Sequence, residues 1–364
     1  MSDILCEVKN RIAFVTLNRP TALNALSLDM VQALHTLLRD CAADTAVAAL
    51  LLRGAGEKAF CAGGDIRALY ASARSGGRIH EEFFPAEYRL DYFLHRYPKP
   101  IIAAIDGITM GGGMGLAQGA SLRIAGERTR IAMPEVGIGL FPDVGASFFL
   151  SRLPGALGPY LALTGALLRP ADALYSGLAD CYLAPDDMPR LATALEALAW
   201  SDSGVIEDLD RTIRAFATDP PPSPAPLAAL RPAIDLHFGR ATVPAILESL
   251  RGETRADYAE WAGQTSTLLM KRSPTMLAVA LRELQRGRTL GLADCFRMEA
   301  GMVRRSLEQG DFLEGIRALL IDKDNAPKWR PDRIEAVSEA SVEAFFLDPW
   351  AGGPHPLADL EADD

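Results

Sequence analysis

Residues 99–116, KPIIAAIDGITMGGGMGL, hold the pattern that decides the fold. The apolar run at 101–105 predicts a strand. A cluster of glycines at 111–115 follows, and a helix is expected to begin near Gly112. Asp106 and the glycines interrupt the apolar run well before the roughly 18 to 20 residues that a membrane span needs. The stretch therefore predicts a strand, a tight turn and a helix of a globular protein.

The same order of elements occurs earlier in the chain. Residues 4–17 predict two short strands, and Ser27 is placed to cap a following helix. The apolar run at 47–52 predicts a buried strand, and an extended segment at 60–61 leads through Gly63 and Gly64 to Asp65, a second helix cap. Because strand, strand and helix recur about every forty to fifty residues, we interpret residues 1–190 as one α/β domain of stacked ββα units.

Strand patterns stop after about residue 185. Residues 191–364 are therefore expected to form a mainly helical region, with the proline-rich stretch DPPPSPAP at 219–226 as an extended linker. Ser273 followed by Pro274 predicts the start of one of its helices. The terminal stretch from residue 352, GGPHPLADLEADD, is expected to be frayed.

Composition restricts the class of protein. The chain has 364 residues, 49% of them hydrophobic and 23% charged, which is ordinary for a soluble globular protein. Its formal net charge of −10 provides no basic field for nucleic acid or for an anionic membrane, so neither is expected as a partner. The five cysteines are scattered, and no long apolar run opens the sequence, so we expect a cytoplasmic protein without disulfides.

Several kinds of active site can be excluded by motif. The sequence has no G-x-S-x-G elbow, no H-E-x-x-H pair and no P-loop, and the glycine cluster lacks the third glycine of a dinucleotide fingerprint. Histidines lie far apart and no C-x-x-C pair occurs, so no metal site is expected. Cys61 is a conceivable nucleophile, but the pattern favours a small buried thiol.

Two glycine turns and two carboxylates remain. The turns at 61–65 and 110–113 each lead into a helix, where unpaired amides could hold an oxyanion, although both could equally be simple tight turns. Glu135 and Asp143 lie in the apolar stretch MPEVGIGLFPDVG at 133–145. Burial there would raise the pKa of a carboxyl group and suit it to acid, base or nucleophile chemistry. Asp143 could instead cap the helical segment at 146–152.

These segments resemble the crotonase (enoyl-CoA hydratase/isomerase) superfamily, and within it the 3-hydroxyisobutyryl-CoA hydrolases. The resemblance extends over nearly the whole chain and is weakest from about 187 to 265. It rests on five segments: FCAGGDIR (60–67), KPIIAAIDGITMGGGMGL (99–116), IAMPEVGIGLFPDVGASFFLSRLPG (131–155), LALTG (161–165) and DFLEGIRALLIDKDNAPKWRP (311–331).

The resemblance implies a crotonase-like spiral of ββα units followed by helices. It also implies that the amides of Gly64 and Gly112 form an oxyanion hole for a thioester carbonyl, with Glu135 as the reacting carboxylate and Asp143 as its catalytic partner. Glu135 would act either as a nucleophile, forming a mixed anhydride, or as a base toward water. Asp143 would bind the substrate hydroxyl group or protonate the departing thiolate.

Three further residues are implied in binding. Glu87 matches a position that contacts the substrate acyl group, although a solvated helix face would explain it as well. Lys58 and Arg67 flank the first glycine turn, where the superfamily binds the phosphates of coenzyme A, and either could be an ordinary surface charge. No cofactor is expected beyond the coenzyme A of the substrate, and a homo-oligomer is possible because crotonases commonly form trimers.

One difference from the hydratases indicates the reaction class. Hydratases hold a water between two glutamates, one of which follows the glycine triplet by two residues, and that position is Gly115 here. Asp143 stands where hydratases usually carry glycine. We therefore expect an acyl-CoA thioester hydrolase that converts 3-hydroxyisobutyryl-CoA to the free hydroxy acid and coenzyme A, as in valine catabolism, with 3-hydroxypropionyl-CoA left open as a second substrate. The alternatives are an enoyl-CoA hydratase/isomerase and a catalytically silent acyl-CoA-binding protein.

Overall fold

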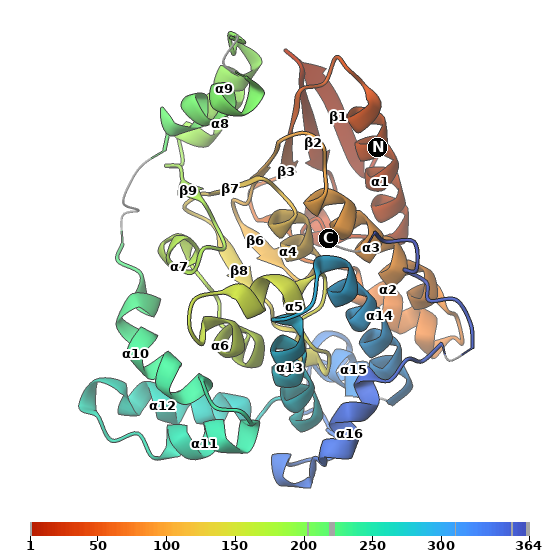
Figure 1. Cartoon of the computed structure of the whole chain (residues 1–364), viewed down its shortest axis with the longest axis vertical. Helices are drawn as coiled ribbons and strands as arrows, with labels where there is room; N and C mark the ends of the chain where they lie inside the picture. Colours follow the sequence, from red (N-terminus) through yellow and green to blue (C-terminus); the bar gives the residue numbers. More distant parts are fainter. Residues whose placement is uncertain (1, 202–203, 218–222, 310, 351, 362–364) are drawn as a thin grey trace. The chain divides into compact units, whose positions relative to one another are not determined.

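Strand–strand–helix repeats organise the N-terminal half of the computed structural model, which describes residues 2–201, 204–217, 223–309, 311–350 and 352–361. The larger sheet has six strands in the order β1-β2-β3-β5-β7-β9 (Figure 1). Only its first pair, β1 with β2, is antiparallel, whereas the following pairs are parallel. Its strands are β1 (Ile4–Lys9), β2 (Ile12–Leu17), β3 (Ala49–Gly54), β5 (Ile101–Ala104), β7 (Leu122–Ala125) and β9 (Cys181–Tyr182).

A second sheet takes the second strand of each later repeat. Its three strands, in the order β4-β6-β8, are β4 (Ala59–Cys61), β6 (Ile108–Met110) and β8 (Arg130–Ala132). From β3 onward, successive strands along the chain alternate between the large and the small sheet, whereas β1 and β2 both belong to the large one. Helices α1 (Leu28–Ala43) and α4 (Gly112–Gln118) each follow a strand pair. The expected ββα spiral is confirmed. The expected caps at Ser27 and Asp65 are also present, since each side chain accepts a bond from a backbone N–H of the first helical turn.

Apolar side chains on one face of the large sheet form a core with two helices. Alternate residues such as Ile12 and Phe14 on β2 point to this face, in register with Ala49 and Leu51 on β3. The helices that cover them are α8 (Asp187–Glu196) and α9 (Val205–Arg214), whose leucines and isoleucine belong to the same cluster. The sheet is thus buried by a segment that the sequence placed outside the α/β domain.

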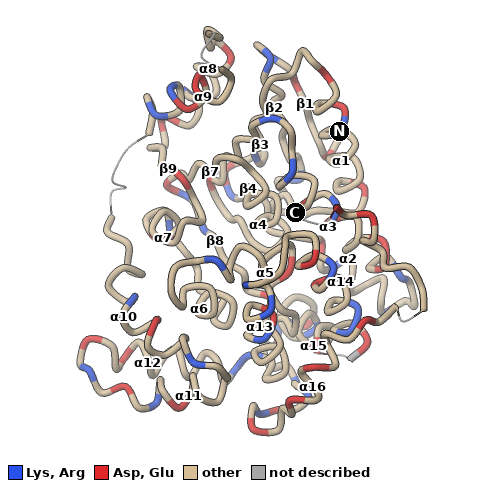
Figure 2. Tube along the Cα trace, viewed as in Figure 1, with Lys and Arg blue, Asp and Glu red and all other residues tan. Residues whose placement is uncertain are grey.

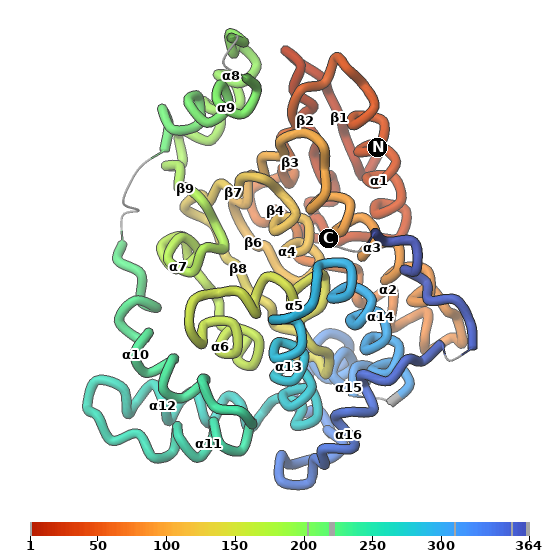
Figure 3. Tube along the Cα trace, in the orientation of Figure 1, coloured from red at the N-terminus to blue at the C-terminus, as the bar shows by residue number. Residues whose placement is uncertain are grey.

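The chain divides into two compact units that do not follow the sequence-based division at residue 190. Unit 1 comprises Met1–Gly64, Phe93–Ile131 and Leu167–Leu227, and unit 2 comprises Asp65–Tyr92, Ala132–Ala166 and Ala228–Asp364. Each unit thus assembles three stretches that lie far apart along the colour scale of Figure 3. The division into residues 1–190 and 191–364 therefore stays a prediction about domains. The two units defined by Cα packing divide the chain at other positions. Of the linker predicted at 219–226, residues 219–222 lie outside the described residues, and Pro226 already begins helix α10 (Pro226–Phe238).

Unit 2 is built from helices. Ser273 caps α13 (Pro274–Gly287) through its hydroxyl group, with Pro274 at the first helical position as predicted. Two other long helices, α3 (Ile79–His95, whose last turn belongs to unit 1) and α14 (Leu292–Gln309), carry three of the buried acidic residues described below. The remaining α-helices of this unit are α2 (Ile66–Arg74), α5 (Ala146–Phe149), α6 (Leu157–Thr164), α10, α11 (Val243–Arg251), α12 (Ala256–Leu269), α15 (Asp311–Ile316) and α16 (Glu339–Glu343).

The terminal stretch is ordered, in contrast to the expected fraying. Leu357 is fully buried, and Arg297 on α14 donates hydrogen bonds to the carbonyl groups of Leu357 and Leu360. Asp359 forms an ion pair with Arg89 on α3 at 2.7 Å. The expectation of fraying was wrong for residues 352–361. Glycine and proline make this stretch irregular, but the burial of Leu357 and the bonds from Arg297 to the backbone hold it against α14.

Charge is mixed over the molecule. Figure 2 shows Lys and Arg interspersed with Asp and Glu along the trace. Within the described part of the chain, none of the helices combines the length and the apolar character that crossing a membrane would require.

Candidate active site

The two glycine turns lie side by side within unit 1. Strand β4, which precedes the first turn, pairs with β6, which precedes the second. A Cβ atom at Gly113 would lie 2.1 Å from the carbonyl oxygen of Cys61, so only glycine allows this approach. Gly63 has φ +99°, and a Cβ atom there would lie 3.4 Å from the amide nitrogen of Gly112. The structure therefore brings together two turns whose convergence the spacing did not predict.

The two amides proposed for the oxyanion hole occupy suitable backbone positions. Gly112 is the first residue of α4 after the capping residue Gly111, so the helix does not use its N–H group. Gly64 forms a parallel bridge with Leu26, and Leu26 donates its own N–H to Gly63. In such a bridge the bonds run to the residues on either side of the paired one, so the N–H of Gly64 is not used either. The oxyanion role of Gly64 and Gly112 stays a prediction that this geometry permits.

Glu135 lies in unit 2 at the start of a short 3₁₀ helix (Glu135–Ile138) that follows β8. The residue is only 5% exposed, and its Oε2 atom has no hydrogen-bond partner among the described residues. Burial, reinforced by repulsion from Asp143, raises its pKa well above the ordinary value for a glutamate. An unpartnered buried acceptor is rare in proteins and calls for a proton, a water or a ligand.

Asp143 is buried to the same extent, at 5% exposure, and it does not cap a helix through its side chain. The capping residue of α5 is Gly145, and no side chain bonds to the first turn of that helix. Instead, the hydroxyl group of Tyr88 donates a hydrogen bond of 2.7 Å to Oδ2 of Asp143. Burial raises the pKa of Asp143 to about 6, although the bond from Tyr88 opposes the rise. The helix-cap explanation is thus wrong.

Glu87 lies in the middle of α3 and is 2% exposed, so the alternative of a solvated helix face is also wrong. Its Oε1 atom has no hydrogen-bond partner in the described chain. Burial and the nearby Asp143 raise its pKa well above the ordinary value. Glu87, Asp143 and Glu135 therefore belong to one buried acidic cluster in unit 2, in which each charge affects the others.

Four further residues belong to this cluster that the sequence did not single out. They share full burial and a position on α3, α13 or α14, and they are Tyr88, Asp91, Glu283 and Glu299. Two sequence signals could have found some of them. Asp91 follows Glu87 by one helical turn, and Glu299 lies between Phe296 and Val303 at the spacing of an apolar helix face. No comparable signal distinguishes Tyr88 from Tyr92, the other tyrosine of α3.

The residues predicted to bind coenzyme A phosphates are both exposed. Lys58 lies before β4 in unit 1, and Arg67 lies on α2 in unit 2, so their roles stay predictions. Cys61 is fully buried in β4, in line with a structural thiol. In the ranges that the structure describes, no group of three or more His, Cys, Asp or Glu side chains is arranged to hold a metal ion.

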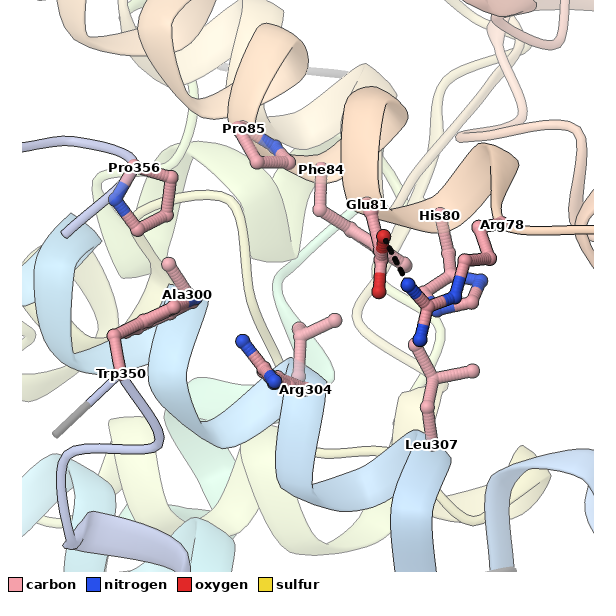
Figure 4. A pocket seen from close by; sticks show the side chains of 11 residues that line it. Arg78, His80, Glu81, Phe84, Pro85, Ala300, Arg304, Leu307, Trp350 and Pro356 are labelled. Carbon is pink, nitrogen blue, oxygen red and sulfur yellow. Dashed lines mark ion pairs between the residues drawn. The ribbon is translucent and has the colours of Figure 1, made fainter. Parts of the chain in front are cut away.

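A separate cavity of about 320 Å³ lies between α3 and α14 within unit 2 (Figure 4). Figure 4 shows Phe84 and Pro85 of α3 on one side, Ala300 and Arg304 of α14 on the other, and Trp350 at the edge. None of the predicted site residues lines it. The cavity is therefore distinct from the acidic cluster, although the same two helices border both.

The acidic cluster can perform acid–base or nucleophilic chemistry. Carboxyl groups that are buried together cannot all ionise near neutral pH, so some hold protons while others are charged. Glu299, with a pKa raised to about 8 by burial, and Asp143, at about 6, illustrate the spread. Two neighbouring carboxyl groups whose pKa values differ in this way can act as an acid and a base at the same pH.

Comparison with known proteins identifies close relatives. A protein from Danio rerio named 3-hydroxyisobutyryl-CoA hydrolase, mitochondrial, is 40% identical over 346 residues, or 95% of this chain and 89% of the relative. The small ribosomal subunit protein mS47 of Neurospora crassa is 39% identical over 365 residues, covering 95% of this chain and 72% of that protein. Relatives can thus carry quite different names at similar identity.

These relatives overturn the expected cytoplasmic location. The Danio rerio protein and those of Gallus gallus and Xenopus tropicalis, 38% and 39% identical, are all named as mitochondrial hydrolases. The expectation was wrong because scattered cysteines argue only against a disulfide framework, which does not distinguish one reducing compartment from another.

A solved structure confirms the predicted fold class. A protein described as a carnitinyl-CoA dehydratase from Mycobacterium thermoresistibile superimposes with a TM-score of 0.87 at 40% identity, covering 96% of this chain and 98% of that chain. The family model for enoyl-CoA hydratase/isomerase matches residues 12–346, which is nearly the whole sequence. The chain belongs to the enoyl-CoA hydratase/isomerase family.

Proposed function

We propose that this protein is a thioester hydrolase that converts 3-hydroxyisobutyryl-CoA and water to the free hydroxy acid and coenzyme A, a step suited to valine breakdown. The observation that carries the proposal is the buried pair Glu135 and Asp143, in which Oε2 of Glu135 has no partner among the described residues and Tyr88 fixes Asp143. The names of the Danio rerio, Gallus gallus and Xenopus tropicalis relatives support this substrate.

In the proposed reaction, the amides of Gly64 and Gly112 donate to the thioester carbonyl oxygen and stabilise its negative charge. Losing one such donor typically costs about 10² to 10³ in rate. A C–O bond forms at the carbonyl carbon as the C–S bond breaks, and the thiolate of coenzyme A leaves and takes up a proton. No cofactor beyond the coenzyme A of the substrate is required for this chemistry.

Glu135 begins the reaction in one of two ways. As a base, its carboxylate removes a proton from the attacking water; as a nucleophile, it attacks the carbonyl carbon and forms a mixed anhydride that water then hydrolyses. A single turnover in ¹⁸O-labelled water distinguishes them, because only the anhydride route transfers label into the Glu135 side chain. The raised pKa of Glu135, due to burial, makes its carboxylate a stronger base once it is ionised.

Asp143 and Glu87 are assigned to the hydroxyl group of the substrate. A carboxylate accepts a hydrogen bond from a hydroxyl group, and Glu87 Oε1 is a buried acceptor without a partner in the described chain. The acyl chain is less well constrained. The 3-hydroxypropionyl and 3-hydroxyisobutyryl groups differ by one methyl group, worth about 1 to 3 kcal/mol in a pocket.

The test is release of free thiol from 3-hydroxyisobutyryl-CoA by the wild-type protein and by Glu135→Gln. The variant keeps the size of the side chain but removes its basicity, so we expect a loss of about 10² to 10⁴ in kcat with coenzyme A binding retained. Exposed Glu308 on α14 provides a matched control, Glu308→Gln, which should hydrolyse at the wild-type rate. Near-normal hydrolysis by Glu135→Gln would refute the assignment.

A second candidate activity is hydration or dehydration of an acyl-CoA, favoured by the dehydratase description of the structure from Mycobacterium thermoresistibile. Gly115, buried in α4, leaves no acid at the place where hydratases carry their first glutamate. Loss of the enoyl absorbance of crotonyl-CoA on incubation with the protein would support this activity. The third alternative is a catalytically silent protein, which would bind acyl-CoA but would neither release thiol from it nor add water to crotonyl-CoA. The relative from Neurospora crassa that is named as a ribosomal protein is the reason to test for it.

A further inference from the structure

The backbone around Asp143 adopts a strained conformation. Val144 has φ 57° and Gly145 has φ +86°, so two successive residues lie in the left-handed region. That region is unfavourable for a β-branched side chain such as valine, and Val144 is 1% exposed. Such strain persists only where the surroundings hold the backbone in place, and it concentrates at functional sites.

Helix α14 holds this turn through Glu299. Oε2 of Glu299 accepts a hydrogen bond of 2.7 Å from the N–H of Gly145, and Oε1 accepts one of 3.0 Å from the N–H of Ser147. The hydroxyl group of Ser147 donates to the same Oε1 atom. Phe296, one turn earlier on α14, lies against Gly145, where a Cβ atom would come within 3.0 Å of its ring. A fully buried carboxyl group thus satisfies three donors immediately after Asp143.

Helix α3 holds the side chain of Asp143 from another direction. Tyr88 is fully buried and donates its hydroxyl hydrogen to Oδ2 of Asp143 at 2.7 Å. Its ring contacts Phe296 with centroids 5.8 Å apart and Phe84 with centroids 6.0 Å apart. The aromatic packing fixes the ring, and the ring directs the hydroxyl group toward Asp143.

We infer that Tyr88 and Glu299 are positioning residues, which fix the side chain and the backbone of Asp143 so that its carboxylate can accept a hydrogen bond from the substrate hydroxyl group. The inference rests on the proposed function for the identity of the substrate and for the activity readout, whereas the positioning of Asp143 rests on the contacts described above. It also indicates how a hydroxylated acyl group is selected, because the bond from Tyr88 to Oδ2 fixes the direction in which the remaining lone pairs of the carboxylate can accept a bond from a substrate hydroxyl group.

The charge state of Asp143 depends on every acid that surrounds it. Glu87 and Asp91 face the cluster from α3, Glu135 from its 3₁₀ helix, Glu283 from α13 and Glu299 from α14. The hydrogen bond from Tyr88 favours the ionised form of Asp143 and lowers its pKa, against the effect of burial. Removing that bond therefore raises the pKa of Asp143 above about 6.

Tyr88→Phe tests the side-chain contact, since it removes one oxygen and keeps the ring. We expect kcat on 3-hydroxyisobutyryl-CoA to fall about 10- to 100-fold, as for loss of a bond to a charged group. The limb of the pH–rate profile that requires ionised Asp143 should move to higher pH. Tyr92→Phe is the matched control, because Tyr92 also contacts Phe296 from α3 but donates to the carbonyl group of Glu361. This control should keep the wild-type rate and pH profile.

A double-mutant comparison separates positioning from a merely structural role. If Tyr88 acts through Asp143, Tyr88→Phe should cost little further activity in an Asp143→Asn background. An equal loss in both backgrounds, or a loss without movement of the pH limb, would overturn the inference. Glu299→Gln should likewise lower kcat. If that variant does not fold, Ser147→Ala removes one of the three bonds, and we expect a loss of about 2- to 10-fold. Full activity in the folded variants would overturn the role of Glu299.

A readout without substrate keeps this inference separate from the proposed function. The ¹³C signal of the Asp143 carboxyl group, assigned by difference from Asp143→Asn, should titrate near pH 6 in the wild-type protein and at higher pH in Tyr88→Phe. Absence of thiol release by the wild-type protein would refute the hydrolase proposal alone. An unchanged titration in Tyr88→Phe would refute the positioning role alone.

Discussion

Replacing Glu299 by glutamine should change how the stability of the protein depends on pH. Glu299 is fully buried on α14, and burial raises its pKa from 4.5 to about 8. The folded state therefore keeps a proton that the unfolded state releases, and folding becomes less favourable as pH rises from about 4.5 to about 8. The neutral glutamine cannot titrate, so the variant lacks this contribution.

The two effects of the substitution have opposite signs, and their sizes can be compared. A pKa of about 8 in the folded state costs the wild-type protein about 3 kcal/mol at pH 7 and about 5 kcal/mol above pH 8. Glutamine offers one acceptor oxygen, so either Gly145 or Ser147 loses the acceptor for its buried N–H, at about 1 to 3 kcal/mol. We therefore expect the variant to be less stable than the wild-type protein near pH 5 and more stable above pH 8.

Urea unfolding at a series of pH values from 4.5 to 8.5 measures this difference directly. The free energies of unfolding of the two proteins should cross between these limits. Glu308→Gln, on the exposed face of the same helix, controls for loss of a carboxyl group in general and should not produce a crossing. Parallel curves for wild-type protein and Glu299→Gln would show that Glu299 does not hold a proton in the folded state, and the reasoning would fail.

Three further changes have definite expected outcomes. Gly113→Ala places a Cβ atom 2.1 Å from the carbonyl oxygen of Cys61, so we expect destabilisation of about 1 to 3 kcal/mol or more in urea unfolding, and a stable variant would contradict the close approach of the glycine turns. Glu87→Gln should lower kcat/KM for 3-hydroxyisobutyryl-CoA more than for isobutyryl-CoA, measured by thiol release; an equal loss on both would exclude recognition of the hydroxyl group. Asp143→Asn removes the negative charge that is the second cause, besides burial, of the raised pKa of Glu135. The limb of the pH–rate profile that requires ionised Glu135 should therefore move to lower pH, and movement to higher pH would refute the coupling.

Local patterns predicted the elements well because their causes are local. Ser27 and Asp65 cap helices as expected, and the apolar run near Leu50 forms a central strand, since side-chain caps and strand burial depend on a few neighbouring residues. Packing between distant segments was not predictable in this way. Leu195 and Ile213 cover the large sheet from a region that shows only a helical pattern, and nothing in that pattern specifies which surface it covers.

Prediction from sequence also identified only some of the residues of the candidate site. Glu135 and Asp143 were identifiable because acids in an apolar stretch are unusual, and the structure buries both. Tyr88 could not be identified, because its partner Asp143 lies 55 residues further along the chain. Glu299 is further still, 154 residues from Gly145. Hydrogen-bond partners at such separations are determined by the tertiary fold, whereas spacing in the sequence reports only neighbours within an element.

The surroundings of the two central carboxyl groups, Glu135 and Asp143, restrict the chemical roles that each can take. Asp143, with a pKa of about 6, is mostly ionised at neutral pH, and Tyr88 already donates to it. An ionised Asp143 is suited to accept a bond from a substrate hydroxyl group and poorly suited to protonate a departing thiolate. Burial and the charge of Asp143 raise the pKa of Glu135 well above the ordinary value for a glutamate, which makes its carboxylate a stronger base or nucleophile than that of an ordinary glutamate once it is ionised. The charges thus favour recognition by Asp143 and chemistry by Glu135.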